Sequence, residues 1–396
     1  MQAKNIVVGV SGGIAAYKTA ELVRLFVRKD FYTRVVMTEN ATRFISPLTF
    51  EALSGNRVIS DMFTGDNSSI EHIVWGQESD LVVVAPATAN IIAKMANGIA
   101  DDFLSTMLVA ATAPILLCPA MNTRMFLNPA VQTNIDTLKK RGHIIMAPGD
   151  GDLACHAKGT GRLPEPPEIF EQALFMLTRK DFSGKKVLVT AGPTVEPIDP
   201  VRFISNRSSG RMGYALARAA RLRGAEVTLI SGPTSIPSPA GVETVHVKTA
   251  EDMRAAVMEK RGEMDVIIKA AAVADYRPAV AAGQKIKKGP ESMVISLEKN
   301  PDILSELGKT KKDFSYLLIG FAAETEDLVK NAREKLARKS LDMIVANDVS
   351  RKDAGFDTNT NIVKIIYSDG TMEDLPLMTK DDVAFNVLDR IKSLLP

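Results

Sequence analysis

Three residues in the first half of the chain have side chains suited to proton transfer and carboxylate binding: His72, Asn122 and Cys155. An imidazole titrates near neutral pH and can act as a base, while an amide can orient a carboxylate and a thiol can supply a proton. Cys155 lies within 149–163, a glycine-rich segment without periodicity that predicts an exposed, mobile loop able to close over a site. Taken singly, the histidine is equally consistent with a packed side chain, the asparagine with a helix cap, and the cysteine with an incidental thiol.

The second half contains groups suited to phosphate binding. Residues 204–213 provide hydroxyl groups and close backbone at the predicted start of a helix, namely Ser208, Ser209, Gly210 and Gly213. The lysine run at 285–288 can neutralise a triphosphate, or it can be a solvated run of charge. The pair Asn300-Pro301 predicts an N-cap followed by proline at the first helical position, a structural feature that also offers an anion site.

Continuous apolar segments in the first half predict the strands that must position these groups. The segments are 5–10, 33–38, 81–88, 114–122 and 143–148, and segments of helical spacing separate them. This alternation is typical of a parallel sheet covered by helices on both faces. Ligands of such sheets bind beyond the carboxyl ends of the strands, where we find Ser11, Thr38, Thr88 and Asn122.

The turn Ser11-Gly12-Gly13 after the first strand bears on the kind of ligand. It precedes a helix, so its backbone amides can approach a phosphate. The spacing is not GxGxxG, and the second strand ends at Met37-Thr38 without an acidic residue for a ribose. Both observations argue against a dinucleotide and favour a mononucleotide such as FMN, although a tight turn without a ligand is an equal alternative.

The second half repeats the α/β pattern. Strands are predicted at 185–192, 225–232, 316–325 and 342–348, with a further strand starting at 264 and a helix over 213–222. A long loop punctuated by prolines follows the first of these strands, so the glycine turn of a dinucleotide fingerprint is missing. Alternation at 362–370 predicts a hairpin at the sheet edge. We predict two doubly wound α/β domains, at 1–182 and 183–396.

Composition limits the partners and the compartment. The net charge of +2 gives no general reason to expect nucleic acid or a membrane surface as a partner. The two cysteines, Cys118 and Cys155, form no disulfide or zinc pattern, which favours a reducing compartment. The N-terminus lacks the pattern of a signal peptide, and no apolar run approaches the ~20 residues of a membrane helix. We therefore expect a cytoplasmic protein.

Four segments of the first half together resemble the flavoprotein cysteine decarboxylases, specifically the phosphopantothenoylcysteine decarboxylases: 69–73, 85–90, 119–122 and the Cys155 loop. The resemblance implies a flavodoxin-like fold, a trimer, and FMN at a subunit interface. It implies His72 as the catalytic base, Asn122 as the carboxylate-binding group and Cys155 as the proton donor. The implied flavin contacts are Ser11, Gly12, Gly13, Thr38, Thr88, Asn90 and Ser105. One departure is His156, which stands where the family commonly has glycine after the cysteine.

Segments of the second half resemble the phosphopantothenate–cysteine ligases: 191–213, 271–277, 285–288, 300–302 and 346–348. The resemblance implies a Rossmann-like dimer that uses CTP and Mg²⁺ to activate 4′-phosphopantothenate as an acyl-cytidylate before cysteine attacks. Lys285 would serve formation of that intermediate and Asn206 would hold it. The implied nucleotide contacts are Ser208, Ser209, Gly210, Asp275, Lys285, Asn300, Pro301, Asp302, Phe321 and Lys339; the metal ligands are not identified. A trimeric domain fused to a dimeric one predicts a larger closed assembly, a dodecamer.

Three alternatives compete with a bifunctional enzyme of coenzyme A biosynthesis. An NAD(P)-dependent oxidoreductase would need GxGxxG turns and ribose-binding acids, which neither half has. A non-catalytic, flavin-binding regulatory protein would be favoured if His72, Asn122 or Cys155 were missing, and all three are present. A decarboxylase acting on peptidyl cysteine would not need the ligase-like second half.

Overall fold

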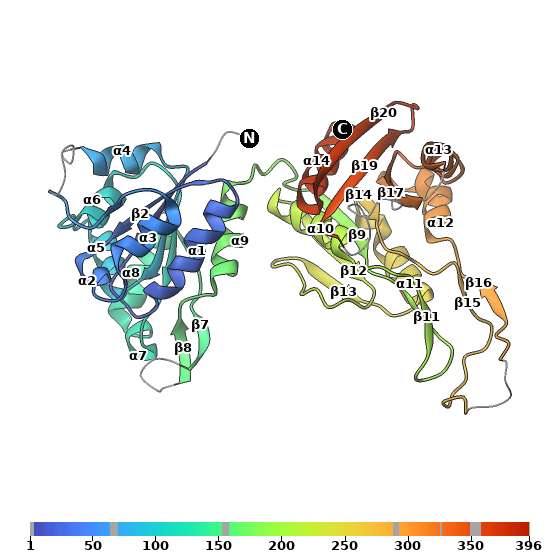
Figure 1. Cartoon of the computed structure of the whole chain (residues 1–396), viewed down its shortest axis with the longest axis horizontal. Coiled ribbons are helices and arrows are strands. Elements are labelled where there is room, and N and C mark those ends of the chain that lie inside the picture. Colours follow the sequence, from blue (N-terminus) through green and yellow to red (C-terminus); the bar gives the residue numbers. More distant parts are fainter. Residues whose placement is uncertain are drawn as a thin grey trace. The chain divides into compact units, whose positions relative to one another are not determined.

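The computed structural model describes residues 4–63, 70–152, 158–287, 293–324, 327–348 and 358–395. The chain divides into two compact units, Met1–Thr178 and Arg179–Pro396, each with its own sheet and core (Figure 1). Among the described residues, no helix combines the length and the apolar character that crossing a membrane requires.

The front unit contains a six-stranded parallel sheet with the order β3-β2-β1-β4-β5-β6. The strands are β1 (Asn5–Val10), β2 (Tyr32–Met37), β3 (Val58–Ile59), β4 (Leu81–Ala87), β5 (Ile115–Pro119) and β6 (Ile144–Ile145). The doubly wound class predicted from the apolar runs is confirmed. In detail the order is 3-2-1-4-5-6, as in the Rossmann fold, rather than the 2-1-3-4-5 order of flavodoxin. The chain reverses its direction of travel between β1 and β4, and this switch point is where such sheets bind ligands.

Helices cover both faces of the front sheet (Figure 1). One face packs against α1 (Ala16–Arg28), α3 (Pro47–Ser54) and α9 (Pro166–Leu177), which bury Phe26, Phe50 and Ile169. The other face packs against α4 (Glu71–Glu78), α5 (Ala89–Asn97), α6 (Phe103–Ala110) and α8 (Pro129–Lys140). Two single turns, α2 (Glu39–Thr42) and α7 (Thr123–Phe126), complete the unit.

The prediction of an irregular loop over 149–163 is wrong for the part that the structure describes. Residues Gly149–Asp152 (β7) and Lys158–Arg162 (β8) pair as an antiparallel ribbon. These strands have no alternating apolar pattern, because four of their residues, Gly149, Gly151, Gly159 and Gly161, are glycines. Backbone hydrogen bonds form the ribbon without requiring a hydrophobic face.

The second unit contains an eight-stranded sheet with the order β13-β12-β9-β14-β17-β18-β19-β20. The strands are β9 (Lys186–Ala191), β12 (Glu226–Ser231), β13 (Glu243–His246), β14 (Val266–Lys269), β17 (Leu317–Glu324), β18 (Met343–Asp348), β19 (Thr360–Tyr367) and β20 (Met372–Thr379). All neighbours are parallel except β18–β19 and β19–β20, so the hairpin predicted at 362–370 is confirmed.

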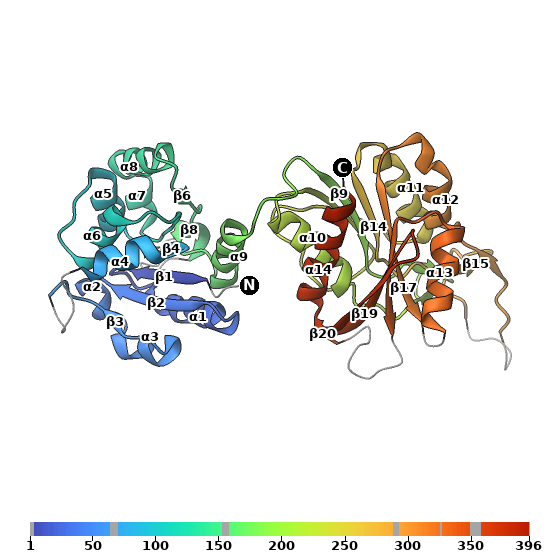
Figure 2. The same cartoon turned by 90° about the horizontal axis from the view of Figure 1, so that it is seen from above.

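Helices cover both faces of this sheet (Figure 2). One face carries α10 (Arg211–Leu222) and α14 (Lys380–Leu394), and the other carries α11 (Ala250–Lys260), α12 (Ile303–Thr310) and α13 (Leu328–Arg338). A short 3₁₀ turn follows α11 at Arg261–Glu263, and another follows α12 at Lys311–Asp313. Helix α10 lies very close to β9, since a Cβ atom on Gly213 would come within 2.5 Å of the Ala191 Cβ.

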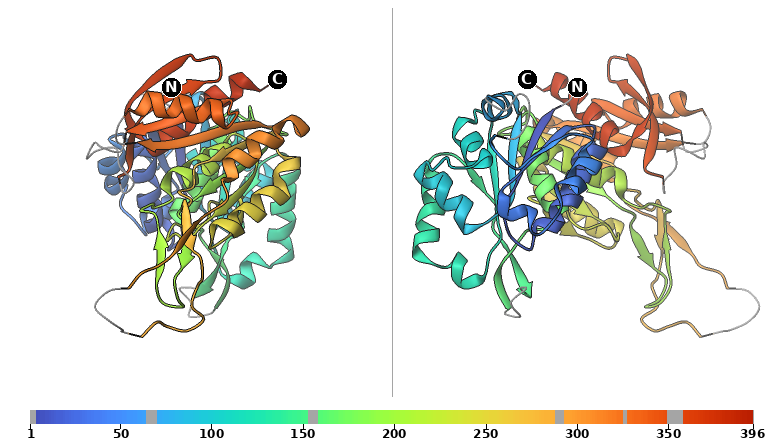
Figure 3. Two further views of the ribbon diagram at one scale, coloured as in Figure 1. Left: turned by 90° about the vertical axis from the view of Figure 1, so that its right-hand side faces the viewer. Right: turned by 60° about the vertical axis from the view of Figure 1, so that its left-hand side comes forward.

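Two antiparallel ribbons project from the carboxyl edge of this sheet (Figure 3). The first joins β10 (Val195–Pro197) to β11 (Phe203–Ser205), and the second joins β15 (Tyr276–Pro278) to β16 (Leu297–Lys299). They follow β9 and β14, two neighbouring strands, so their bases leave the sheet side by side. Of the predicted ligase residues, Lys285 lies between the two strands of the second ribbon, and Asn206 follows the first ribbon.

Candidate active sites

A cavity of about 1020 Å³ opens at the switch point of the front sheet. It brings together seven of the residues predicted for this site: Ser11, Gly12, Gly13, Thr38, Thr88, Asn90 and Asn122. Polar groups from the strand ends line one part, and apolar groups such as Ile91, Met121, Met125 and Leu163 line another. A mixed lining of this size is typical of a site for a small organic ligand.

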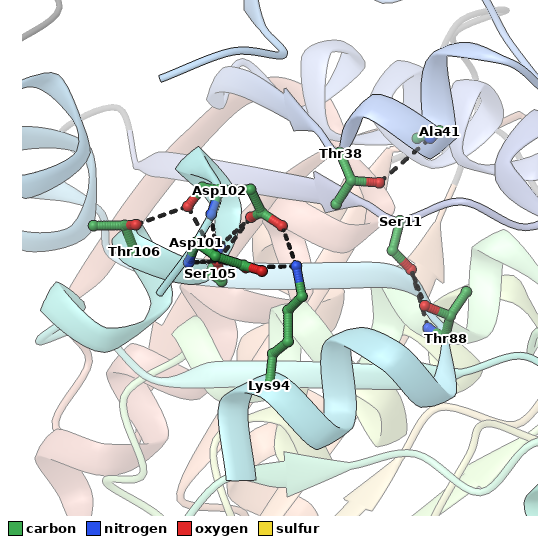
Figure 4. Close-up of polar contacts among 9 residues, drawn as sticks. All are labelled: Ser11, Thr38, Ala41, Thr88, Lys94, Asp101, Asp102, Ser105 and Thr106. Carbon is green, nitrogen blue, oxygen red and sulfur yellow. Dashed lines mark hydrogen bonds and ion pairs between the residues drawn. The ribbon is translucent and has the colours of Figure 1, made fainter. Parts of the chain in front are cut away.

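Ser11 connects the first and fourth strands at the base of the cavity. Its Oγ lies 2.7 Å from the Pro86 carbonyl oxygen and 3.0 Å from Thr88 Oγ1, and it accepts a hydrogen bond from the Thr88 amide at 3.0 Å (Figure 4). The side chain is buried. A buried hydroxyl with these partners fixes the spacing of the two strand ends.

The glycine turn after Ser11 is required by close packing. A Cβ atom on Gly12 would lie 2.5 Å from the Asn40 Cβ and 2.9 Å from the Asn40 carbonyl carbon. Any side chain at Gly12 would therefore push the turn away from α2. Thr38 begins α2, and its Oγ1 accepts a hydrogen bond from the Ala41 amide at 3.3 Å.

An ion-pair cluster that the sequence analysis did not identify also lines the cavity. Lys94 Nζ lies 2.6 Å from an Asp101 carboxylate oxygen and 2.8 Å from one of Asp102 (Figure 4). Burial lowers the pKa of Lys94, but the hydrogen bonds with the two carboxylates outweigh it and the net pKa is raised. The sequence does contain a signal for part of this cluster: Asp102 precedes an apolar helical segment, and aspartate is favoured at the N-cap of a helix.

Ser105, which was predicted to contact the flavin, forms hydrogen bonds with Asp102 in the structure. It forms a capping box with Asp102: its amide donates to Asp102 Oδ1 at 2.7 Å, and its Oγ accepts from the Asp102 amide at 3.1 Å. The Ser105 side chain is buried and is not among the residues that line the cavity. It therefore shapes the cavity wall through Asp102.

His72 is likewise not among the residues that line the cavity of its own chain. Its ring packs edge-on against Phe103, with ring centroids 6.2 Å apart, and Phe103 follows Asp102 of the cavity wall. The Nδ1 atom is buried and has no hydrogen-bond partner within the described part of the chain. Cys155 and His156 lie outside the described residues.

In the second unit, two predicted asparagines hold the loop after β14. Asn206 Nδ2 donates to the Ala272 and Val273 carbonyl oxygens at 3.3 and 3.1 Å. Asn300 Nδ2 donates to the Ala274 carbonyl oxygen at 2.9 Å, and the Asn300 amide donates to the Asp275 carbonyl oxygen at 2.9 Å. Residues from two separate segments are thus brought to one loop.

The prediction that Asn300 caps a helix with Pro301 at its first position is wrong. Helix α12 begins at Ile303, and its N-cap is Asp302, whose Oδ1 accepts from the Ser305 amide at 3.0 Å. Asn300 lies two residues before that cap, and its Nδ2 atom donates to the loop after β14. Asp302 also pairs with Lys339 at 2.8 Å, which joins two predicted nucleotide contacts.

Lys269, at the end of β14, is a further charged residue beside this pair and was not predicted. It is buried, and its Nζ lies 3.7 Å from the Met253 Sδ. Burial lowers the pKa of Lys269 to about 7; the charge of Asp302 acts in the opposite direction and that of Lys339 in the same one. The only signal in the sequence was a lysine within an otherwise apolar strand.

The remaining predicted contacts lie elsewhere around the sheet edge. Phe321 packs against the core on the α10 and α14 face, opposite the face that carries Asp302 and Lys339. Gly210, with φ of +77°, is the N-cap of α10, and its amide donates to Ser208 Oγ at 3.4 Å; Ser209 immediately precedes it. Lys285 is exposed on the segment that follows β15.

Comparison with known proteins identifies both units. The family model described as Flavoprotein matches residues 1–176, and that described as DNA/pantothenate metabolism flavoprotein C-terminal domain matches residues 182–395. The chain is 49% identical to the Coenzyme A biosynthesis bifunctional protein CoaBC of Bacillus subtilis (strain 168), over 99% of this chain and 97% of that protein. It is 45% identical to the protein of that name from Vibrio cholerae, over 98% of each.

The chain is also similar to a solved structure. The crystal structure of the C-terminal domain of a Coenzyme A biosynthesis bifunctional protein CoaBC is 46% identical, with a TM-score of 0.47, and covers 55% of this chain and 98% of its own. The identity of the relatives over nearly their full length, with both family models in order, establishes the relationship. The chain belongs to the family of coenzyme A biosynthesis bifunctional proteins, and it is a bifunctional enzyme with a flavoprotein unit in front.

Proposed function

We propose that the second unit joins 4′-phosphopantothenate to cysteine with CTP, and that the front unit decarboxylates the phosphopantothenoylcysteine so formed to 4′-phosphopantetheine. The observation that carries the proposal is the front cavity, whose polar and apolar linings meet at the switch point of the sheet. The fused ligase unit supplies the substrate of the decarboxylase. The two assignments therefore support each other.

The residues of the front cavity suit FMN. The turn Ser11-Gly12-Gly13 and the N-terminus of α5 offer backbone amides to a phosphate, and Ile91, Met121 and Leu163 offer apolar surface to a planar ring. When bound, the flavin supplies the electron acceptor for oxidation of the cysteine thiol. Asn122, which lines the cavity and is the N-cap of α7, would orient the substrate carboxylate that leaves as CO₂.

His72 and Cys155 would move the protons. We assign proton removal from the substrate thiol to His72 and reprotonation of the product to Cys155. Because His72 does not line the cavity of its own chain, we propose that it acts at the cavity of a neighbouring copy in a trimer. Within the described residues the buried Nδ1 atom has no hydrogen-bond partner, as expected of a side chain that meets a group absent from the single chain.

The ligase chemistry would take place at the carboxyl edge of the second sheet. The pantothenate carboxylate attacks the α-phosphorus of CTP, pyrophosphate leaves, and the cysteine amine then displaces CMP from the acyl carbon. Lys285 and Lys339 would stabilise the charge on the phosphates, together with Mg²⁺ on the phosphate oxygens. Asn206 and Asn300 would hold the acyl-cytidylate against the loop at 272–275.

The proposal is tested by incubating the pure protein with 4′-phosphopantothenate, CTP, cysteine and Mg²⁺. We expect a yellow protein that releases CMP, pyrophosphate and CO₂. His72→Asn should accumulate phosphopantothenoylcysteine with CMP release intact. Lys285→Gln should stop CMP release and still decarboxylate added phosphopantothenoylcysteine. A colourless protein that takes up no FMN and consumes no CTP would refute both assignments.

A further inference from the structure

Asp199 occupies the turn between β10 and β11 and carries a side chain with none of its surface exposed. Its Oδ1 accepts hydrogen bonds from the Val201 and Arg202 amides at 2.8 and 2.7 Å. Its Oδ2 accepts a third, from the Ile286 amide at 3.1 Å, across 87 residues of sequence. The carboxylate therefore joins the tip of the first ribbon to the segment that carries Lys285.

Other contacts hold the same segment at the same place. The Ala282 amide donates to the Ile198 carbonyl oxygen at 2.9 Å, and Arg202 Nη2 donates to the Ile286 carbonyl oxygen at 3.3 Å. Both backbone groups of Ile286 are thus engaged by the turn at 198–202. Lys285 immediately precedes Ile286, so the backbone of the lysine is fixed while its side chain is exposed.

The negative charge of Asp199 strengthens its hydrogen bonds with the backbone amides. Burial raises the pKa of Asp199, but the backbone hydrogen bonds from Val201, Arg202 and Ile286 outweigh it and the net pKa is lowered, so the group is a carboxylate at neutral pH. An ionised acceptor binds amide donors more strongly than a neutral one does. The two oxygens of Asp199 have different partners: Oδ1 stabilises the local turn, and Oδ2 holds the distant segment.

We propose that Asp199 is a positioning residue of the ligase, which fixes the segment at 279–287 on the first ribbon so that Lys285 is presented to the nucleotide. The inference rests on the proposed role of Lys285. Asp199 itself has no exposed surface with which to contact a substrate, and it acts through the backbone of Ile286.

The substitution Asp199→Asn separates the two tasks of the carboxylate. The amide oxygen can still accept from Val201 and Arg202 and keep the turn. The amide nitrogen would then face the Ile286 amide, and because both are donors the contact with the distant segment is lost. Glu196→Gln is the matched control, because Glu196 is a buried carboxylate of the same ribbon whose Oε1 accepts from the Ala250 amide, in α11.

Hydrogen–deuterium exchange on the full-length protein measures the positioning directly. In Asp199→Asn we expect exchange over 279–287 to become faster by on the order of tenfold, with exchange over 195–205 unchanged. Glu196→Gln should leave exchange over 279–287 at the parent rate. Unchanged exchange over 279–287 in Asp199→Asn would overturn the inference, whatever the activity of the protein.

Kinetics then connect the position of the segment to catalysis. Asp199→Asn should lower kcat for CMP release by on the order of tenfold and leave decarboxylation of added phosphopantothenoylcysteine unchanged. Faster exchange over 279–287 with an unchanged kcat would overturn the inference, whereas failure of the parent protein to release CMP would refute the proposed function instead.

Discussion

The Ser11 hydroxyl group provides a test of how the front cavity is built. Ser11→Ala removes a buried group that contacts Pro86 and Thr88, so we expect a loss of stability of about 1–3 kcal/mol and a lower flavin content. The ratio of flavin absorbance to protein measures the second effect. Thr19→Ala is the control: Thr19 Oγ1 donates to the Ala85 carbonyl oxygen at 2.7 Å but does not line the cavity, so it should cost stability and leave flavin content unchanged.

Lys269 gives a pH-dependent prediction at the same scale. The pKa of about 7 in the folded protein lies below the ordinary value of 10.5, so between these values the unfolded chain binds a proton that the folded chain does not. The lysine therefore destabilises the fold most at pH 7 and below, and this cost disappears as pH rises toward 10.5. Lys269→Met should raise the melting temperature of the second unit by several degrees at pH 7 and by much less at pH 10.

The control for this prediction is Lys186→Met, on the neighbouring strand β9. Lys186 is partly exposed and pairs with exposed Glu263 at 3.3 Å, so its removal should change the melting temperature little at either pH. An equal effect of Lys269→Met at pH 7 and pH 10 would show that packing, and not the charge of the ammonium group, sets the cost.

At the scale of elements, Lys94 joins α5 to the start of α6. Lys94→Met leaves Asp101 and Asp102 without their shared cation, and we expect the turn before α6 to loosen. Phe103 and the His72 ring that packs on it would shift with the turn. Decarboxylation of added phosphopantothenoylcysteine should fall by on the order of tenfold, with CMP release unchanged. Lys94→Arg, which keeps the charge, should restore part of the loss, and equal losses in both variants would contradict this account.

The elements that could be predicted from the sequence are those that bury a continuous apolar run. Segments such as 5–10 and 81–88 are almost entirely hydrophobic, and they became β1 and β4 at the centre of the sheet. The β7–β8 ribbon was not predicted because it is held by backbone hydrogen bonds and by a contact between Thr160 and Asp150, and its glycines carry no apolar pattern. The same limit applies to β10 and β11, three residues each, which lie in a segment read as a proline-punctuated loop.

The sequence indicated which residue types are suited to the two sites, but it did not indicate which residues contact one another. Ser11, Thr88 and Asn122 follow strands, and the parallel sheet brings the ends of those strands together. Asp302 was expected at the nucleotide, yet its capping of α12 was assigned to Asn300, because both residues have side chains that can cap. Asp199 was missed because its partner Ile286 is distant in sequence, and nothing local indicates which oxygen holds which segment.

At the scale of the whole molecule, the proposed division of the decarboxylase site between copies has a genetic test. His72→Asn and Asn122→Ala each disable the front site, one through the base and the other through the cavity. If His72 acts at the cavity of a neighbouring copy, then co-expression of the two variants should create mixed trimers in which some sites have both residues intact. If His72 acts within its own chain, every site carries one defect.

The expected recovery follows from random mixing. With equal amounts of the two chains, the chance that a site receives an intact histidine from one copy and an intact asparagine from the next is about one quarter. Decarboxylation by the co-expressed mixture should therefore reach about a quarter of the parent rate, while the two variants purified separately and then assayed together without exchange should remain inactive. Inactivity of the co-expressed mixture, with mixed assemblies verified by mass spectrometry, would place His72 and Asn122 in the same chain's site and would remove the reason for a shared cavity.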